Sequence, residues 1–245
     1  MLKNSMESPP QSQTLRHYTN IPFEVFVAVF TILPFFLLAY FYPMLPDRVP
    51  LFMKLNGEVA EWAQKSVISV FRVPLLALIM QIVCLLMKYG TIQSASVVPV
   101  EMGIDQVKLH EQSLHLNARL WDWFRWTIAF KMSAEAIDTI LIGFDFRLLA
   151  RVTFIVTWIA ALIGASGALY YGYRLLVLRR SMKEFGDFKL HEPVDRTHVY
   201  GGFLYFNSSD PALFSRRYGF NFANKWAWVF IACIIAYPLL VFLPK

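Results

Sequence analysis

Long apolar runs alternate with shorter polar stretches along this chain, and the pattern predicts helices that cross a membrane. A helix of about 20 mostly apolar residues spans the hydrocarbon core of a bilayer. We expect five such helices, over residues 21–42, 67–87, 120–144, 152–173 and 226–243. The predicted fold class is therefore an all-α integral membrane protein with about five transmembrane helices.

The run 120–144 is the exception, because it carries five charged side chains: Asp122, Arg125, Lys131, Glu135 and Asp138. A charge near the bilayer centre costs about 2.5–3.5 kcal/mol on insertion scales. An amphipathic helix on the membrane surface is the alternative. Basic residues accumulate in 174–225, and cytoplasmic loops are enriched in Lys and Arg. This bias favours a spanning helix, with the N-terminus in the cytoplasm and the C-terminus outside.

The remaining stretches divide the chain into predicted regions. Residues 1–20 are polar and read as a disordered cytoplasmic tail, and 21–173 form a four-helix membrane region with an outer loop at 43–66. Residues 88–118 are expected to be a polar connector with some helix. Residues 174–225 form a cytoplasmic segment with a strand–turn–helix insertion, in which a strand-like stretch at 202–206 precedes a short helix, Pro211–Arg217, capped by Asp210. The last helix, 226–243, follows.

Polar residues inside the predicted spans form a candidate site. Lys131, Glu135 and Asp138 share one helix face, because they are spaced i, i+4 and i, i+3. That face should point into the bundle, toward Arg72 and Gln81 of the second helix. We predict that Arg72 pairs with Asp138 and Lys131 with Glu135, with Gln81 near the level of Lys131. These five residues either neutralise one another or form an ion- or proton-sensitive pocket.

The amino-acid composition excludes several classes of protein and of binding site. Hydrophobic residues make up 57% of the 245 and charged residues 16%, against about 25% charged in soluble domains. The net charge of +6 is explained by basic cytoplasmic loops, so nucleic acid is not an expected partner. Cys84 and Cys233 lie in apolar runs and are expected to be buried, inert thiols. His110 and His115 are five apart, on different helix faces, so no metal site is expected.

The loop after the first helix, Tyr42 to Ser66, is rich in proline and contains the turn signal Asn56-Gly57. It resembles a bacterial membrane domain of unknown function that is also found in SdpI-type toxin-immunity proteins. The residues that carry this outer-loop motif are Pro46, Asp47, Pro50, Gly57, Trp62 and Lys65. The chain has Phe52, Met53 and Lys54 where that family often has His-Phe-Asn, so a role of the family histidine does not carry over.

The stretch Tyr200 to Trp228 resembles a second domain of unknown function that accompanies the first in some bacterial membrane proteins. The candidate cytoplasmic motif and headgroup contact comprises Tyr205, Asn207, Asp210, Arg216, Arg217 and Asn221. Basic side chains beside a membrane helix attract anionic lipid headgroups. An ordered cap, docked on the helix ends through aromatic residues, is the alternative.

The two resemblances imply a protein of the bacterial cytoplasmic membrane. The first expectation is a non-enzymatic protein of binding, immunity or signalling type, whose outer loop meets a peptide or envelope ligand and whose cytoplasmic segment meets a protein partner. The alternative is an accessory subunit of a transporter or membrane-enzyme complex, docked through the small residues of Gly164–Ala168, although packing within the chain is the favoured use of that face. No nucleophile-elbow or phosphate-binding glycine motif is present, so no catalytic residue or cofactor is expected, and acid–base catalysis by Glu135 and Asp138 is the least favoured reading.

Overall fold

Five long helices make up most of the described structure. The computed structural model describes residues 18–53, 58–95, 104–184, 198–200, 204–209, 213–215 and 219–242. The helices are α1 (Ile21–Phe41), α2 (Val67–Ala95), α3 (Ile104–Gly143), α4 (Arg147–Glu184) and α5 (Lys225–Phe242). Each overlaps one of the predicted apolar runs.

Several helices are longer than the apolar runs that predicted them. Most of the expected polar connector 88–118 is helical, because α2 continues to Ala95 and α3 begins at Ile104. At about 1.5 Å per residue, the 40 residues of α3 extend for about 60 Å. The apolar runs therefore marked the apolar centres of these helices and not their polar ends.

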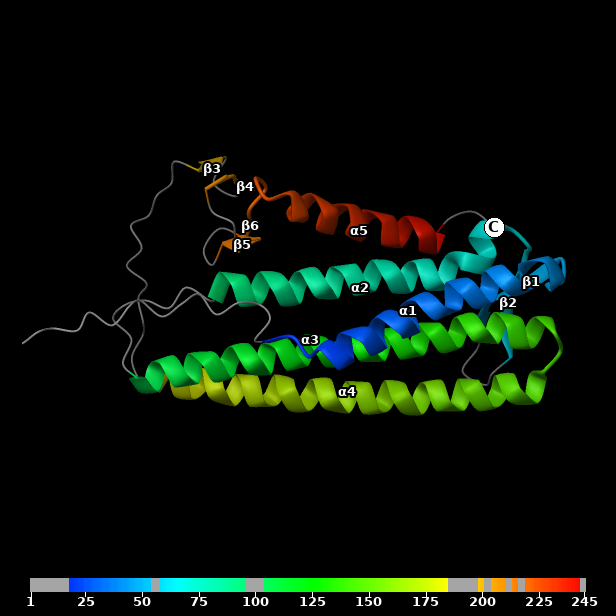
Figure 1. The fold of residues 1–245 in the computed structure, drawn as a ribbon, viewed down its shortest axis with the longest axis horizontal. Helices are drawn as coiled ribbons and strands as arrows, with labels where there is room; N and C mark the ends of the chain where they lie inside the picture. The colour runs from blue at the N-terminus through cyan, green and yellow to red at the C-terminus, as the bar shows by residue number, and fades with distance from the viewer. Residues whose placement is uncertain are drawn as a thin grey trace, which may run out of the picture.

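The helices run alternately up and down and pack side by side (Figure 1). α4 packs on α3, α3 on α2 and α2 on α5, while α1 lies across α2 and α3. The first helix begins where Asn20 accepts a hydrogen bond from the Phe23 amide, and Pro22 occupies its first turn. Within the described residues, three helices are long and apolar enough to cross a membrane: Ile21–Met44, Val67–Gln93 and Arg147–Leu178. α5 is apolar but shorter, and the charged α3 is packed among the others.

The loop after α1 forms a hairpin at one end of the bundle. A 3₁₀ turn, η2 (Tyr42–Met44), leads into β1 (Arg48–Met53), which pairs antiparallel with β2 (Val59–Gln64). Leu45 and Val49 are buried in a cluster with residues of α1, α2 and α3. The prolines did exclude a helix here, and hydrophobic anchoring holds the strands on the helix ends.

The segment before α5 forms two small hairpins at the opposite end (Figure 1). β3 (Val199–Tyr200) pairs with β4 (Leu204–Tyr205), and β5 (Phe214–Ser215) pairs with β6 (Gly219–Phe220). The predicted helix Pro211–Arg217 is thus wrong at Phe214–Ser215, which is a strand; residues 210–212 and 216–218 lie outside the described ranges. Cross-strand pairing with Gly219–Phe220 overrides the local capping signal.

Buried residues attach this segment and the start of the chain to the bundle. Leu213, fully buried, packs with Leu86 of α2 and Ala227 of α5. Tyr18 is also buried, against Ile92 and against Leu114 and Ala118 of α3. Within the predicted disordered tail, residues 18–20 are therefore ordered. Residues 1–17 of that tail lie outside the described part of the chain.

Small residues let α4 approach α3 closely. A Cβ atom added at Gly164 would lie 1.8 Å from Thr127 Oγ1, and one added at Gly167 would lie 2.6 Å from the Trp123 ring. These distances are far shorter than any van der Waals contact. The small-residue face therefore packs within the chain, as expected.

We predict that Gly164→Ala lowers the unfolding temperature of the detergent-purified protein by several degrees, because overpacking costs about 1–3 kcal/mol. Gly172→Ala is the matched control on the same helix, since an added Cβ there meets nothing within 4 Å. Thermal unfolding followed by tryptophan fluorescence checks both variants. Equal unfolding temperatures for the two would contradict the close packing of α3 on α4.

Candidate functional site

The five charged residues of the apolar run 120–144 fall on two opposite faces of α3. Asp122 and Arg125 face α1 and α2. Lys131, Glu135 and Asp138 line a cavity bordered by α2, α4 and α5. Nine residues separate Asp122 from Lys131, which is about two and a half helical turns, so the two groups point in opposite directions.

The first group belongs to a buried charge network that joins three helices. Lys88 Nζ of α2 lies 2.6 Å from Asp122 Oδ1, and Arg125 Nη2 lies 2.7 Å from Glu24 Oε2 of α1. Weaker contacts cross-link the pairs, at 3.4 Å between Lys88 and Glu24 and 3.8 Å between Arg125 and Asp122. Two acids balance two bases, so the network carries no net charge.

Gln81 completes this network. Its Nε2 donates to the Arg125 carbonyl at 2.7 Å, and Arg125 Nε donates back to Gln81 Oε1 at 3.3 Å. Gln81 therefore lies beside Arg125, on the face of α3 opposite to Lys131, and does not join the predicted polar face. The sequence offered one signal for the network: Gln81 and Lys88 are seven apart, which places them on one face of α2.

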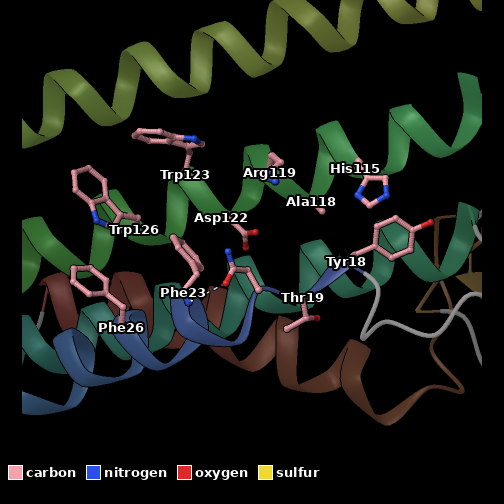
Figure 2. A pocket seen from close by; sticks show the side chains of 11 residues that line it. Tyr18, Thr19, Phe23, Phe26, His115, Ala118, Arg119, Asp122, Trp123 and Trp126 are labelled. Carbon is pink, nitrogen blue, oxygen red and sulfur yellow. Dashed lines mark hydrogen bonds between the residues drawn. The ribbon is translucent and has the colours of Figure 1, made fainter.

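A groove of about 540 Å³ borders the network between the start of α1 and α3 (Figure 2). Aromatic side chains dominate its wall, and the Tyr18 and His115 rings lie 4.8 Å apart. Burial and the nearby Glu111 carboxylate raise the pKa of the Tyr18 hydroxyl, which keeps it neutral. Asp122 reaches this groove already paired with Lys88, so its charge is compensated.

The second group lines a cavity of about 570 Å³ and contains the predicted polar face. The predicted ion pair between Lys131 and Glu135 is confirmed. Asp138 is 3% exposed, and its Oδ1 has no hydrogen-bond partner among the described residues. The cavity is thus lined by an ion pair within α3 and, separately, by the buried carboxyl group of Asp138.

The predicted pairing of Arg72 with Asp138 is not formed. Arg72 is buried, and its Nη2 donates to the carbonyl oxygen of Val241. Val241 lies in the last turn of α5, where carbonyl groups lack an intrahelical partner and attract cations. The end of α5 therefore competes for Arg72, which the sequence could not reveal without the tertiary arrangement.

The outer-loop motif holds the hairpin and reaches the same cavity. Lys65 Nζ donates to the Leu45 carbonyl at 2.7 Å, and the Lys65 amide donates to the Asp47 carbonyl at 2.7 Å. Pro50 of β1 lines the cavity. The Pro46 ring packs over Gly143, Trp62 is 49% exposed, and Gly57 lies outside the described residues.

The described residues of the second motif hold the small hairpins together. Asn221 is fully buried; its Nδ2 donates to the Asn207 carbonyl at 2.9 Å, and its Oδ1 accepts from the Asn207 amide at 3.0 Å. Tyr205 forms a bridge with Asn221. Asp210, Arg216 and Arg217 lie outside the described residues.

We predict that Lys88→Met destabilises the protein by about 3–5 kcal/mol, because it leaves Asp122 as a poorly compensated buried charge. The double variant Lys88→Met with Asp122→Leu should recover much of the loss, since the balanced pair of Glu24 and Arg125 remains. Unfolding in detergent provides the measurement. Lys108→Met is the control, because its 4.0 Å pair with Asp105 is exposed and should contribute little. A double variant no more stable than the single one would refute the compensation.

Residues 29–78 match the model of a domain of unknown function, DUF1648. The match covers the second half of α1, the hairpin and the start of α2, where the outer-loop motif lies. No curated protein and no solved structure matches this chain.

Proposed function

We propose that this chain is a non-enzymatic membrane protein of binding, immunity or signalling type. The observation that carries the proposal is the cavity shared by the β1 strand of the hairpin and the charged face of α3. Pro50 and Leu51 border it together with Asp138. A ligand in the cavity would contact the hairpin directly, which couples a buried polar site to an exposed loop.

The proposed arrangement has five membrane-spanning helices in the cytoplasmic membrane of a bacterium. The N-terminus and the hairpins at 199–220 face the cytoplasm, and the β1–β2 hairpin faces outward. Two features support α3 as a span: it lies between α2 and α4, and its charged residues Asp122, Arg125 and Asp138 are buried. The exposed apolar side chains of α4, among them Leu148, Leu162 and Leu169, then contact lipid.

The bilayer is also the proposed partner of the start of α5. Trp226 and Trp228 are exposed there, and Lys225 Nζ lies 5.8 Å from the centre of the Trp226 ring. Indole rings beside a basic residue suit the headgroup layer, where anionic lipids attract the positive charge. A protein partner of the cytoplasmic segment and a peptide or envelope ligand at the outer hairpin remain part of the proposal.

We predict that cysteines at the two ends of the bundle react from opposite sides of the membrane. Ala60→Cys in β2 and Ser208→Cys beside β4 occupy exposed positions, and Cys84 and Cys233 are replaced by alanine. A maleimide that does not cross membranes should label Ala60→Cys in intact cells and Ser208→Cys only after the membrane is opened. Labelling of both cysteines in intact cells would overturn the five-span arrangement.

Purification in a mild detergent distinguishes the two proposed roles of this chain, a binding protein and an accessory subunit of a larger complex. We expect a monomer or homodimer, since Gly164 and Gly167, the face assigned to a complex, are already packed against α3. Mass determination by light scattering, with identification of co-purified chains, gives the measurement. A second polypeptide in fixed stoichiometry would instead support the accessory subunit.

A further inference from the structure

We propose that the cavity between α2, α3, α4 and α5 binds a small organic cation, whose positive charge is balanced by Asp138. The proposal rests on the proposed binding function and names the chemical class of its ligand.

Asp138 differs from the other buried aspartate of α3. Asp122 is held by Lys88 at 2.6 Å, whereas no hydrogen bond or ion pair engages Asp138 in the described part of the chain. A carboxylate taken out of water is strongly destabilising unless a positive charge compensates it. At 3% exposure, an ionised Asp138 would need a cationic partner, which the described residues of the neighbouring helices do not supply.

With Asp138 ionised, the charges that line the cavity sum to one negative charge. Lys131 is engaged by Glu135, so that pair is already balanced. Glu135 lies one helical turn before Asp138 and adds like-charge repulsion to any ionised state of Asp138. Arg72 donates instead to Val241 at the end of α5. A monovalent cation beside Asp138 restores neutrality.

The size and lining favour an organic cation over a metal ion. A cavity of about 570 Å³ falls within the range of pockets for small molecules, about 300–1,000 Å³. Most of its wall is apolar, and Phe154, Trp158 and Tyr237 add aromatic rings whose faces attract cations. A hard metal ion needs about six oxygen ligands. In the described part of the chain, no group of three His, Cys, Asp or Glu residues is arranged to hold one.

A ligand can enter and leave the cavity beside Lys131 and Glu135, on the face of α3 that points away from α1. Residues two apart on a helix point to nearly opposite sides. Ser133 of α3 donates to the Phe30 carbonyl of α1, so Lys131 and Glu135, each two residues away, face the cavity on the other side. The cavity lining contains no residue of α1. Lys131 and Glu135 are 37% and 39% exposed, so the ion pair stands at the open part of the cavity.

Benzyltrimethylammonium is a suitable probe, and neopentylbenzene is its neutral isostere. The full chain, purified in detergent, is titrated with each compound while its tryptophan fluorescence is followed, since Trp158 lines the cavity. We expect saturable binding of benzyltrimethylammonium, at least tenfold tighter than binding of the isostere, and a rise in unfolding temperature. This comparison uses the unaltered protein, so it does not depend on the folding of any variant.

The charge dependence is tested with Asp138→Asn. We expect at least tenfold weaker binding of the probe and an unfolding temperature, without ligand, no lower than that of the parent protein. Asp145→Asn is the matched control: it removes an exposed acid at the turn between α3 and α4, and asparagine tolerates the positive φ of 61° found there. Probe binding to the control should stay within twofold of the parent value.

Three results would overturn the cation site: no saturable binding of the probe, equal binding of the neutral isostere, or equal binding to the Asp138→Asn variant. Equal binding of the isostere would identify an apolar or lipid-like occupant instead. Sodium or potassium is then added as a competitor, while choline-free buffer salts keep the ionic strength constant. Inhibition of probe binding by either ion would identify an inorganic cation as the occupant and would likewise overturn the proposal. Cysteine labelling and mass determination address the membrane-protein assignment separately, so that assignment can survive a failed cation site.

Discussion

The buried network of Glu24, Lys88, Asp122 and Arg125 is the interaction on which the rest of the bundle depends. Its charges are costly in an apolar interior unless each meets its counterpart, so α1, α2 and α3 are restricted in both depth and rotation. Fixing the rotation of α3 has a second effect. Lys131, Glu135 and Asp138 are thereby turned to the opposite face, where the cavity lies.

Close packing of α4 on α3 transmits this constraint to the other wall of the cavity. Gly164 and Gly167 allow the two backbones to approach at Thr127 and Trp123, and Phe154 and Trp158 of the same helix then line the cavity. Leu45 and Val49 anchor the hairpin to the helices, and its residues Pro50 and Leu51 line the cavity. Structural residues of three separate elements thus set the shape of the site, although none of them carries its charge.

The contrast between Asp122 and Asp138 shows how the setting decides the role of a residue type. Both are buried aspartates on one helix, sixteen residues apart in number. Asp122 faces a lysine on a neighbouring helix and contributes to the architecture. Asp138 lines a largely apolar cavity, and its Oδ1 has no hydrogen-bond partner among the described residues.

The sequence by itself determined the five helices, the end of α1 before the proline-rich loop, and the pair of Lys131 with Glu135, because each follows from local period or from i, i+4 spacing. The cysteines in its apolar runs are buried, as expected. Only the tertiary structure decided that Arg72 caps α5, that Gln81 joins Arg125, and that Phe214–Ser215 is a strand. Those outcomes depend on which helix or strand lies alongside, and contacts between residues distant along the chain leave no period in the sequence from which to infer them.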